Sequence, residues 1–253
     1  MCDTSSSMAW KDNSNVLPLH SAIGLAEIAT QLTNTPFKNK LLTFSTSPEW
    51  ITLPETIYNI PGIGDKNIQD ITKEEWNTPG IEAVSGNFEE RINHIVKSPW
   101  GRSTDFYKAL DLILNSCIES NMSPEEVGEL TLFVFSDMQF DQSLKLSYSW
   151  SHEYTMIKAK FTEAGQKSSY GRPFVVPFII FWNLKGNSLS NPVKGNQEGT
   201  AYISGFSQSA FNSFLDGTLL NNNISRPTPD IIVRNILDND RYKPIKNICQ
   251  EFI

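Results

Sequence analysis

Hydrophobic residues along the chain follow two spacings, and together these predict helices that alternate with short buried strands. Apolar side chains surround much of Pro18–Leu32 and recur at helical spacing over 106–118. Two other stretches, 130–135 and 174–182, are apolar without alternation, which is typical of strands that helices cover on both faces. This alternation predicts an α/β fold with a mostly parallel sheet.

Weaker patterns complete the predicted architecture, a three-layer open sheet flanked by helices. Further strands are expected over 41–45, 50–53 and 200–204. Further helices are expected over 88–96, from Ser123-Pro124 onward, over 151–163, after Ser207 and over 229–237. Residues 54–86 are rich in Pro, Gly, Asn and acids, so we expect a loop or insertion there with one short helix. The chain, 1–253, is then a single domain.

The composition narrows the class of protein. Of the 253 residues, 39% are hydrophobic and 11% aromatic, enough to fill a substantial core, which excludes a disordered chain. The net charge is −7, and no long run of Lys and Arg occurs. A broad surface that tracks the phosphates of nucleic acid is therefore not expected.

Cysteine usage and the absence of membrane signals indicate an intracellular, cytoplasmic protein. Cys2, Cys117 and Cys249 lie far apart and are odd in number, which fits neither a disulfide framework nor a zinc-ligand spacing. No apolar run approaches the ~20 residues that cross a bilayer, and no basic-then-apolar signal pattern opens the chain. We therefore expect a soluble protein with no membrane partner.

The first residues of the chain carry a cluster of oxygen-bearing side chains. Asp3, Ser5 and Ser7 form the pattern D-x-S-x-S, and in an extended segment side chains two residues apart point to the same side. Asp137 directly follows the first long apolar strand, and Thr104 stands at the start of a helix. Ligands gather at the carboxyl ends of parallel strands, and these residues supply five oxygen-bearing side chains on three separate loops.

These residues resemble the metal-ion-dependent adhesion site of the von Willebrand factor type A domain. The matching segments are DTSSSM at 3–8, GRSTDFYKAL at 101–110 and FSDM at 135–138. The resemblance implies that the metal ligands are Asp3, Ser5, Ser7, Thr104 and Asp137. In that family, hydroxyl groups hold Mg²⁺ directly and the carboxylates act mostly through water. One coordination position stays open for an acidic group of a partner.

Hydroxyl ligands suit such a site on chemical grounds. Mg²⁺ requires near-octahedral oxygen coordination at ~2.0–2.1 Å and keeps several waters, so few protein charges suffice. Neutral hydroxyls leave the ion only partly neutralised, so that it attracts a carboxylate strongly. Ser and Thr are poor ligands for zinc, which prefers nitrogen and sulfur. The expected cofactor is Mg²⁺, with Mn²⁺ and Ca²⁺ as alternatives.

A narrower resemblance covers roughly residues 1 to 240. The segments FSDMQFD at 135–141, FWNL at 181–184 and SGFS at 204–207, with Trp100-Gly101 upstream, resemble an uncharacterised family related to the A-type domain of the Ro ribonucleoprotein autoantigen. The resemblance implies the fold and the metal site, but no activity. In Ro, RNA binding belongs chiefly to a separate helical-repeat ring. RNA is therefore expected as a partner only indirectly or through a missing N-terminal region.

The sequence departs from the family pattern at the strand that precedes the metal loop. An A-type domain has the strand order 3-2-1-4-5-6, and its first strand ends at D-x-S-x-S. Here only Met1 and Cys2 remain of that strand, so both facing edges would lack their partner, at ~1–3 kcal/mol for each buried unpaired group. We expect the chain to be the C-terminal part of a longer protein. The alternative is that another polypeptide donates the strand.

The expected function is a Mg²⁺-dependent protein-interaction module whose partner offers Asp or Glu to the metal. An enzyme is not expected, because the sequence shows neither a positioned base nor a cationic clamp beside the ligand motifs, apart from Arg102. Two alternatives remain: a metal-assisted hydrolase in which Asp3 or Asp137 activates water, and the scaffold part of a Ro-like RNA-associated protein.

Simpler roles are also open for several of these residues. A Ser-rich start is on its own more often a free terminus, and Thr104 and Asp137 are suited to capping a helix or turn. Asn183 and Ser204 are expected at strand ends on the same side as the metal, where most such residues satisfy turns.

Overall fold

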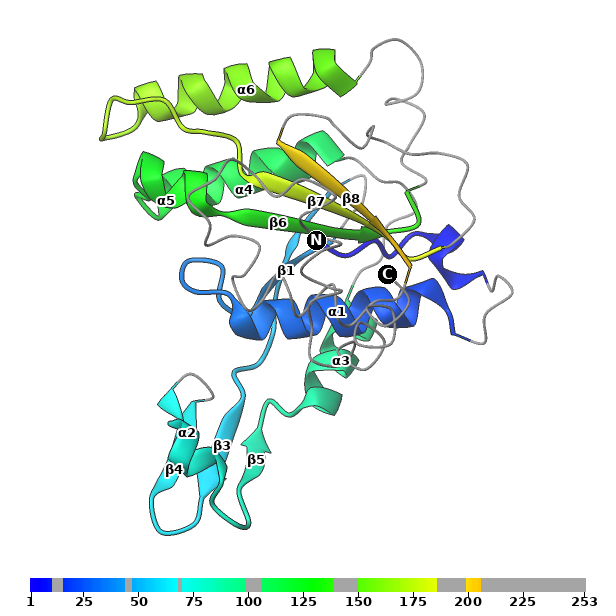
Figure 1. The fold of residues 1–253 in the computed structure, drawn as a ribbon, viewed down its shortest axis with the longest axis vertical. Coiled ribbons are helices and arrows are strands. Elements are labelled where there is room, and N and C mark those ends of the chain that lie inside the picture. Colours follow the sequence, from blue (N-terminus) through cyan, green and yellow to red (C-terminus); the bar gives the residue numbers. More distant parts are fainter. Residues whose placement is uncertain are drawn as a thin grey trace, which may run out of the picture.

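A parallel three-stranded sheet forms the centre of the mixed α/β fold (Figure 1). Its strands, in spatial order, are β6 (Thr131–Ser136), β7 (Phe178–Asn183) and β8 (Thr200–Ser204). The computed structural model describes residues 1–10, 16–43, 47–67, 70–98, 106–138, 150–185 and 199–205. The prediction of parallel strands alternating with helices is confirmed.

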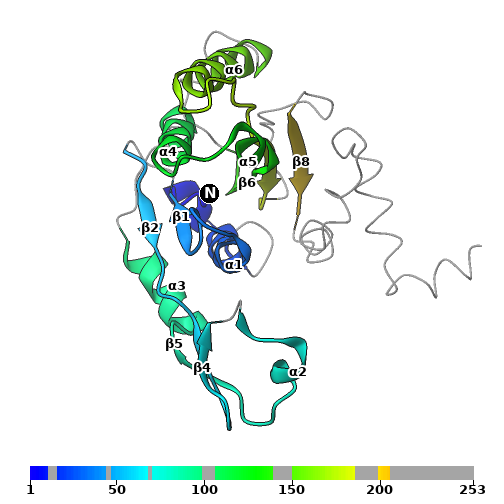
Figure 2. The ribbon, with the colours of Figure 1, turned by 90° about the vertical axis from the view of Figure 1, so that its left-hand side faces the viewer.

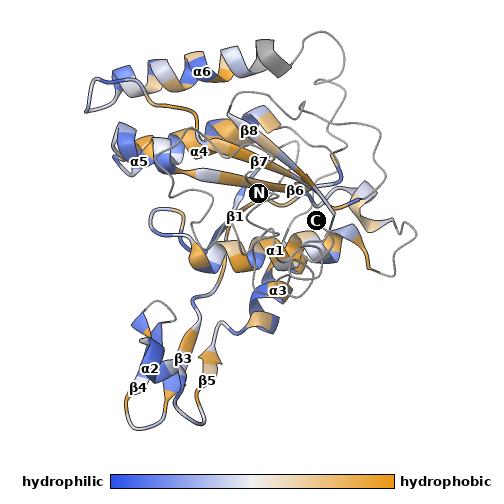
Figure 3. Cartoon of the chain, viewed as in Figure 1, coloured by the Kyte–Doolittle hydropathy of each residue, from blue (hydrophilic) through white to orange (hydrophobic). Residues whose placement is uncertain are grey.

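Helices lie on both sides of this sheet (Figure 1). On one side are α4 (Phe106–Glu119), α5 (Pro124–Glu129) and α6 (Trp150–Lys167); on the other are α1 (Pro18–Leu32) and α3 (Phe88–Lys97). Buried side chains form one cluster on each side, and the strands β6 and β7 contribute to both clusters. Figure 3 shows these two strands as hydrophobic ribbons between helices of mixed polarity, as expected for strands covered on both faces.

A second sheet lies beside the first and is joined to it by the N-terminal residues. It consists of the antiparallel strands β1 (Lys40–Leu42) and β2 (Trp50–Thr52). Cys2 makes parallel bridges to Thr43 on one side and to Phe135 on the other. The N-terminus therefore lies between β1 and β6 (Figure 1). The 3₁₀ helix η1 (Ser6–Ala9) follows this segment.

An arm projects away from the two sheets (Figures 1 and 2). It contains β3 (Ile57–Ile60), β4 (Gly64–Asn67), β5 (Glu82–Ser85) and the short helix α2 (Lys73–Trp76), with the strands antiparallel in the order β4-β3-β5. The segment 54–86, expected as a loop or insertion with one short helix, contains that helix and also three strands that were not predicted. Of these strand residues only Ile60 is buried, so the segment lacks the apolar runs by which the other strands are recognised.

Two element boundaries differ from the prediction for identifiable reasons. The strand expected from 174 begins only after Pro177, which has no N–H to donate to a sheet. The helix expected to close before Gly165 continues to Lys167. A Cβ at Gly165 would lie 2.1 Å from the backbone nitrogen of Phe174, so this glycine permits close packing of the returning chain. The helices predicted after Ser207 and over 229–237 lie outside the described residues.

None of the helices in the described part of the chain is both long and apolar enough to cross a membrane.

Candidate metal centre

Asp3 is fixed at the carboxyl end of β6. Its side chain is fully buried, and its backbone N–H donates to the carbonyl of Phe135 at 2.9 Å. The carboxylate accepts two further hydrogen bonds, from the backbone N–H of Ser5 at 2.9 Å and from the hydroxyl of Ser136 at 2.5 Å. The opening loop and the end of β6 are therefore held together through one carboxylate.

The two serines of D-x-S-x-S converge, although by a different geometry from the one expected. Ser5 has an extended backbone and caps η1, whereas Ser7 lies within that 3₁₀ helix. The hydroxyl oxygens of Ser5 and Ser7 are 2.9 Å apart. A tight turn, rather than an extended strand, therefore brings the two hydroxyls together. The hydroxyl of Thr4, also buried, has no hydrogen-bond partner among the described residues.

Asp137 lies directly after β6 and is also fully buried. The next residue, Met138, has a φ of 63°, and its N–H donates to the Ser136 hydroxyl at 3.0 Å. This left-handed turn fixes the direction in which the chain leaves the strand. The Nζ of Lys185 lies 3.7 Å from Oδ2 of Asp137.

The two carboxylates influence each other electrostatically. Burial raises the pKa of Asp3 above its ordinary value, and the nearby charge of Asp137 raises it further. The hydrogen bonds from Ser136 and Ser5 act in the opposite direction. Two buried carboxylates that repel each other form a place where a cation is stabilising.

The ends of the neighbouring strands lie beside Asp137. Ser136 is in register with Asn183 of β7, and Asn183 is in register with Ser204 of β8. The expected positions of Asn183 and Ser204 at strand ends are thus confirmed. The side chain of Asn183 donates to the Tyr202 hydroxyl at 2.8 Å and accepts from the backbone N–H of Lys185 at 2.8 Å.

Sequence reasoning missed Ser136 and Lys185 as members of the site. Ser136 was visible as the last residue of the apolar strand before Asp137. The available signal for Lys185 was its place two residues after Asn183, at the end of the adjacent strand.

The structure places four of the five predicted ligands, namely Asp3, Ser5, Ser7 and Asp137. Asp3 and Asp137 lie at one end of β6, and the two serines follow Asp3 directly. Thr104 lies outside the described residues, as do Arg102 and Asp141. Across the described ranges, no group of three or more His, Cys, Asp or Glu side chains could hold a metal. The predicted set is of another kind, since it combines two carboxylates with hydroxyl oxygens, and these hard donors fit Mg²⁺.

Comparison with known proteins places the chain in a family. A sequence model of the family described as a domain of unknown function (DUF7788) matches residues 1–80 and 71–246. The chain belongs to the DUF7788 family. It is also similar to the uncharacterized protein L728 of Acanthamoeba polyphaga mimivirus, with 29% identity over 191 residues. The match covers 75% of this chain but only 26% of the viral protein, so the chain spans about a quarter of that relative.

Proposed function

We propose that the chain is a protein-interaction module that binds an acidic group of a partner through Mg²⁺. The ion is held at the carboxyl end of β6 by Asp3, Ser5, Ser7 and Asp137, with Thr104 as the fifth ligand. The supporting observation is the burial of two mutually repelling carboxylates beside a pair of hydroxyl oxygens. We expect this module to act inside the cell, in the cytoplasm, as the sequence predicts.

The proposal includes a von Willebrand A-like, three-layer architecture. Helices on both sides of a parallel sheet, and the position of Met1–Asp3 between β1 and β6, support it. In this arrangement the N-terminal segment takes the place of the first central strand, with β1 and β2 on one side and β6, β7 and β8 on the other. The opening loop then leaves the sheet at its carboxyl edge, where ligands of such sheets bind.

The residues of the candidate site have distinct parts in this function. The hydroxyls of Ser5 and Ser7 are neutral donors, and Asp3 is oriented by the bonds from Ser136 and Ser5. Asp137 supplies the second negative charge. Bound Mg²⁺ supplies a hard Lewis acid with an open position for a partner's carboxylate. Lys185, 3.7 Å from Asp137, adds positive charge at the rim and favours an acidic partner.

Isothermal titration of the purified chain with MgCl₂ tests the proposal. We expect saturable binding of one ion, and we expect it to be lost in Asp137→Asn and weakened in Ser7→Ala. Asp111→Asn is the matched control, because Asp111 is a half-exposed carboxylate on α4 that pairs with Lys160 at 2.7 Å. Equal Mg²⁺ binding by wild type and Asp137→Asn would contradict the proposal.

Capture of a partner provides the second arm of the test. The chain immobilised on resin should retain an acidic protein partner in Mg²⁺ and release it in EDTA, and Asp137→Asn should retain none. Retention that is unchanged by EDTA would contradict a metal-dependent contact.

A metal-assisted hydrolase remains the second candidate because of Lys185. Such enzymes commonly hold an anionic substrate with a cationic side chain beside the metal, and Lys185, 3.7 Å from Asp137, is placed to do this. Hydrolysis of phosphate or carboxylate esters in Mg²⁺ or Mn²⁺, lost in both Asp137→Asn and Lys185→Met, would favour this candidate over a binding module.

A further inference from the structure

The arm formed by β3, β4, β5 and α2 is fixed at its base. The hydroxyl of Thr56 donates to the carbonyl of Gly86 at 2.7 Å, which joins the chain that enters the arm to the chain that leaves it. A Cβ at Gly86 would lie 2.0 Å from the carbonyl oxygen of Glu55, so glycine is needed for this close approach. Arg91 of α3 also donates to the carbonyl of Pro54. The arm is therefore held in a defined position relative to α3.

The helix α2 covers one face of the arm's sheet. The rings of Trp76 of α2 and Tyr58 of β3 meet edge to face, with their centroids 5.0 Å apart. Glu75 of α2 accepts from the ammonium group of Lys66 at 2.7 Å, and Lys66 is directly opposite Tyr58 in the register of β3 and β4. Residues that are opposite each other on paired antiparallel strands face the same side. Tyr58 and Lys66 therefore point to the side on which α2 lies (Figure 2).

The other face of this sheet carries a row of polar side chains. Because successive side chains of a strand alternate between the two faces, Asn59 points away from α2. Asp65 of β4 and Glu82 of β5 are both opposite Asn59 in the register, so the three side chains form a row across the sheet. Asp65 and Glu82 are exposed, and the amide of Asn59 donates to Asp65 at 2.7 Å. The row thus presents two carboxylates to solvent.

A β-bulge keeps a second row in line with the first. The register of β3 with β5 skips Val84, so Ser85 is opposite Ile57. Ile57 is also opposite Asn67 of β4, and its side chain is only half-buried. An apolar side chain therefore lies beside the carboxylates. We call this surface the open face, and it consists of Ile57, Asn59, Asp65, Asn67, Glu82 and Ser85.

Charge indicates the kind of partner that fits the open face. The segment 54–86 has six acidic residues and two lysines, so it carries −4 of the chain's net charge of −7. One of these lysines, Lys66, points to the covered face and pairs with Glu75. The open face itself has two carboxylates and no cationic side chain. It therefore repels the phosphates of nucleic acids and anionic lipids, whereas it attracts Lys and Arg side chains.

We propose that the open face of the arm is a docking surface for an extended, basic segment of a protein partner. Lys or Arg side chains of this segment pair with Asp65 and Glu82, whose strands lie ~10 Å apart on either side of β3. A neighbouring apolar side chain of the segment packs on Ile57. This contact needs no metal ion, so it is independent of the site at the carboxyl end of β6.

A selection from random peptides tests this assignment. The full chain is panned in EDTA against phage-displayed random dodecapeptides, so that metal-dependent contacts are absent. We expect the enriched peptides to contain several Lys or Arg residues and an apolar residue. In fluorescence anisotropy, an enriched peptide should bind the double variant Asp65→Asn and Glu82→Gln at least ~tenfold more weakly than the wild type. No enrichment, or enrichment of neutral or acidic peptides, would overturn the proposal.

The matched control is the double variant Glu119→Gln and Glu129→Gln. It removes two exposed carboxylates outside the arm, on α4 and α5, and changes the net charge equally. This control should bind the peptide as the wild type does. Equal weakening in the two double variants would overturn the proposal, because net charge rather than the open face would then govern binding.

Salt and competing polyanions provide the last arm of the test. Raising NaCl from about 50 mM to about 300 mM should weaken binding of the peptide several-fold, because exposed ion pairs are screened. Binding that is insensitive to salt would contradict the pairing with Asp65 and Glu82. Binding of single-stranded DNA or of phosphatidylserine vesicles to the wild type, lost in the double variant of Asp65 and Glu82, would overturn the choice of a protein partner.

Discussion

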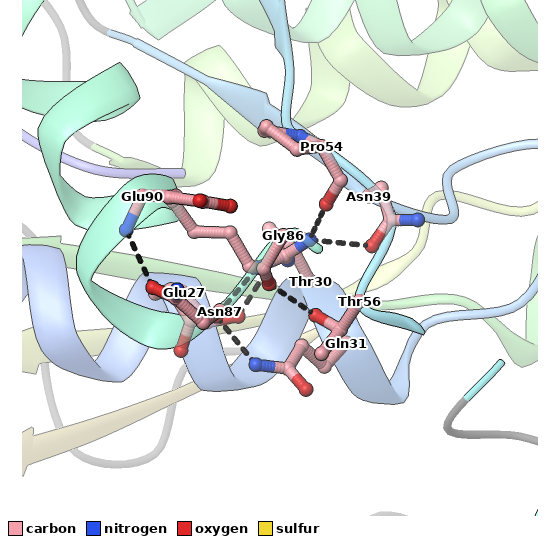
Figure 4. A network of polar contacts seen from close by, with 10 residues as sticks. Glu27, Thr30, Gln31, Asn39, Pro54, Thr56, Gly86, Asn87 and Glu90 are labelled. Atoms are coloured by element: carbon pink, nitrogen blue, oxygen red, sulfur yellow. Dashed lines mark hydrogen bonds and ion pairs between the residues drawn. The ribbon is translucent and has the colours of Figure 1, made fainter. Parts of the chain in front are cut away.

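The described part of the protein buries carboxylates in two places, and the surroundings of these carboxylates differ. Glu27 of α1 and Arg91 of α3 form a fully buried ion pair, with Nε of Arg91 2.7 Å from Oε1 of Glu27. Figure 4 shows Glu27, Thr30, Asn39 and Pro54 in the polar network around this pair. At the carboxyl end of β6, Asp3 and Asp137 are equally buried, but hydroxyl and amide donors hold Asp3. The ammonium group of Lys185 lies 3.7 Å from Asp137.

The Glu27–Arg91 pair belongs to a network that is compensated from within the chain. The guanidinium of Arg91 also donates to Asn39 at 3.0 Å, to Thr30 at 2.7 Å and to the carbonyl of Pro54. These bonds tie α1 and α3 to the segments on either side of β1 and β2, at the base of the arm. The pair has a structural role, because its full positive charge comes from the protein itself.

The cluster at Asp3 and Asp137 differs in the source of its positive charge. Among the described residues, hydroxyl and amide donors hold Asp3, and the partly exposed ammonium group of Lys185 lies 3.7 Å from Asp137. On the proposed function, this pair of buried carboxylates gains stability from an added cation, whereas the Glu27–Arg91 pair does not. The comparison indicates which of the two acidic clusters is available for function.

The largest expected effect is the loss of the structural pair. Arg91→Met leaves Glu27 buried without its partner and should lower the free energy of unfolding by about 3–5 kcal/mol, equally in Mg²⁺ and in EDTA. Urea denaturation measures this change. Lys160→Met, which removes a half-exposed ion pair with Asp111, should cost less than about 1 kcal/mol. A similar loss of unfolding free energy in Arg91→Met and Lys160→Met would contradict the distinction between buried and surface ion pairs.

Metal binding should stabilise the second cluster by a smaller amount. At Mg²⁺ concentrations a hundred times the dissociation constant, the wild type should gain about 2.7 kcal/mol of unfolding free energy over its value in EDTA. Asp137→Asn should show no such gain, and in EDTA it should lose less stability than Arg91→Met, because the repulsion with Asp3 disappears together with the contact to Lys185. Denaturation in the two buffers gives both values.

Strong destabilisation of Asp137→Asn in EDTA would contradict the comparison, because Asp137 would then be a structural group like Arg91. Asp111→Asn serves as the control in both buffers, since its stability should not depend on Mg²⁺.

Lys185 allows a finer test of the electrostatics of the cluster. Lys185→Met removes a positive charge that opposes the approach of Mg²⁺, so the affinity for Mg²⁺ should rise about fivefold, the equivalent of ~1 kcal/mol at a partly exposed site. Calorimetric titration measures the change. Lys167→Met, on the exposed end of α6, should bind Mg²⁺ as the wild type does. Weaker binding by Lys185→Met would instead make Lys185 a group that supports the site.

The last prediction concerns a thiol that reports on the core. Burial raises the pKa of Cys117 from 9.0 to about 12, so at pH 8 its thiolate is roughly a thousandfold rarer than in the unfolded chain. In a Cys249→Ser background, alkylation of Cys117 in the folded protein should be correspondingly slow at pH 8 and should accelerate as the pH rises toward 12. Arg91→Met should speed this reaction by opening the core, whereas Asp137→Asn should not. Equal rates in the two variants would contradict the comparison.

Much of the fold was predictable because the buried elements carry strong local signals. The apolar run that ends at Ser136 and the helix Pro18–Leu32 occur as expected, since helices cover that run and one face of that helix packs in the core, although Ile28 and Leu32 on the same helix are exposed. The arm was not predicted as strands, because its strand residues are mostly exposed and pair through backbone groups that leave no hydrophobic pattern.

Only those parts of the candidate site that lie within a single loop were predictable from the sequence. D-x-S-x-S and Asp137 are recognisable along the sequence, and the position of Asp137 follows from its place after a buried strand. The place of Lys185 depends on which strands lie side by side, and the register of β6 with β7 sets that relation. The bond from Ser136 to Asp3 depends on the N-terminal segment lying beside β6. The Arg91 network joins residues 64 positions apart, and nothing in the local sequence announces it.

Crystals of the chain grown with Mn²⁺ test whether a metal ion binds at the carboxyl end of β6, because the anomalous signal of manganese locates the ion. We expect one strong anomalous peak between the hydroxyls of Ser5 and Ser7 and the carboxylate of Asp137. Crystals of Asp137→Asn should lack this peak. A peak elsewhere, or none between these side chains at saturating Mn²⁺, would contradict it.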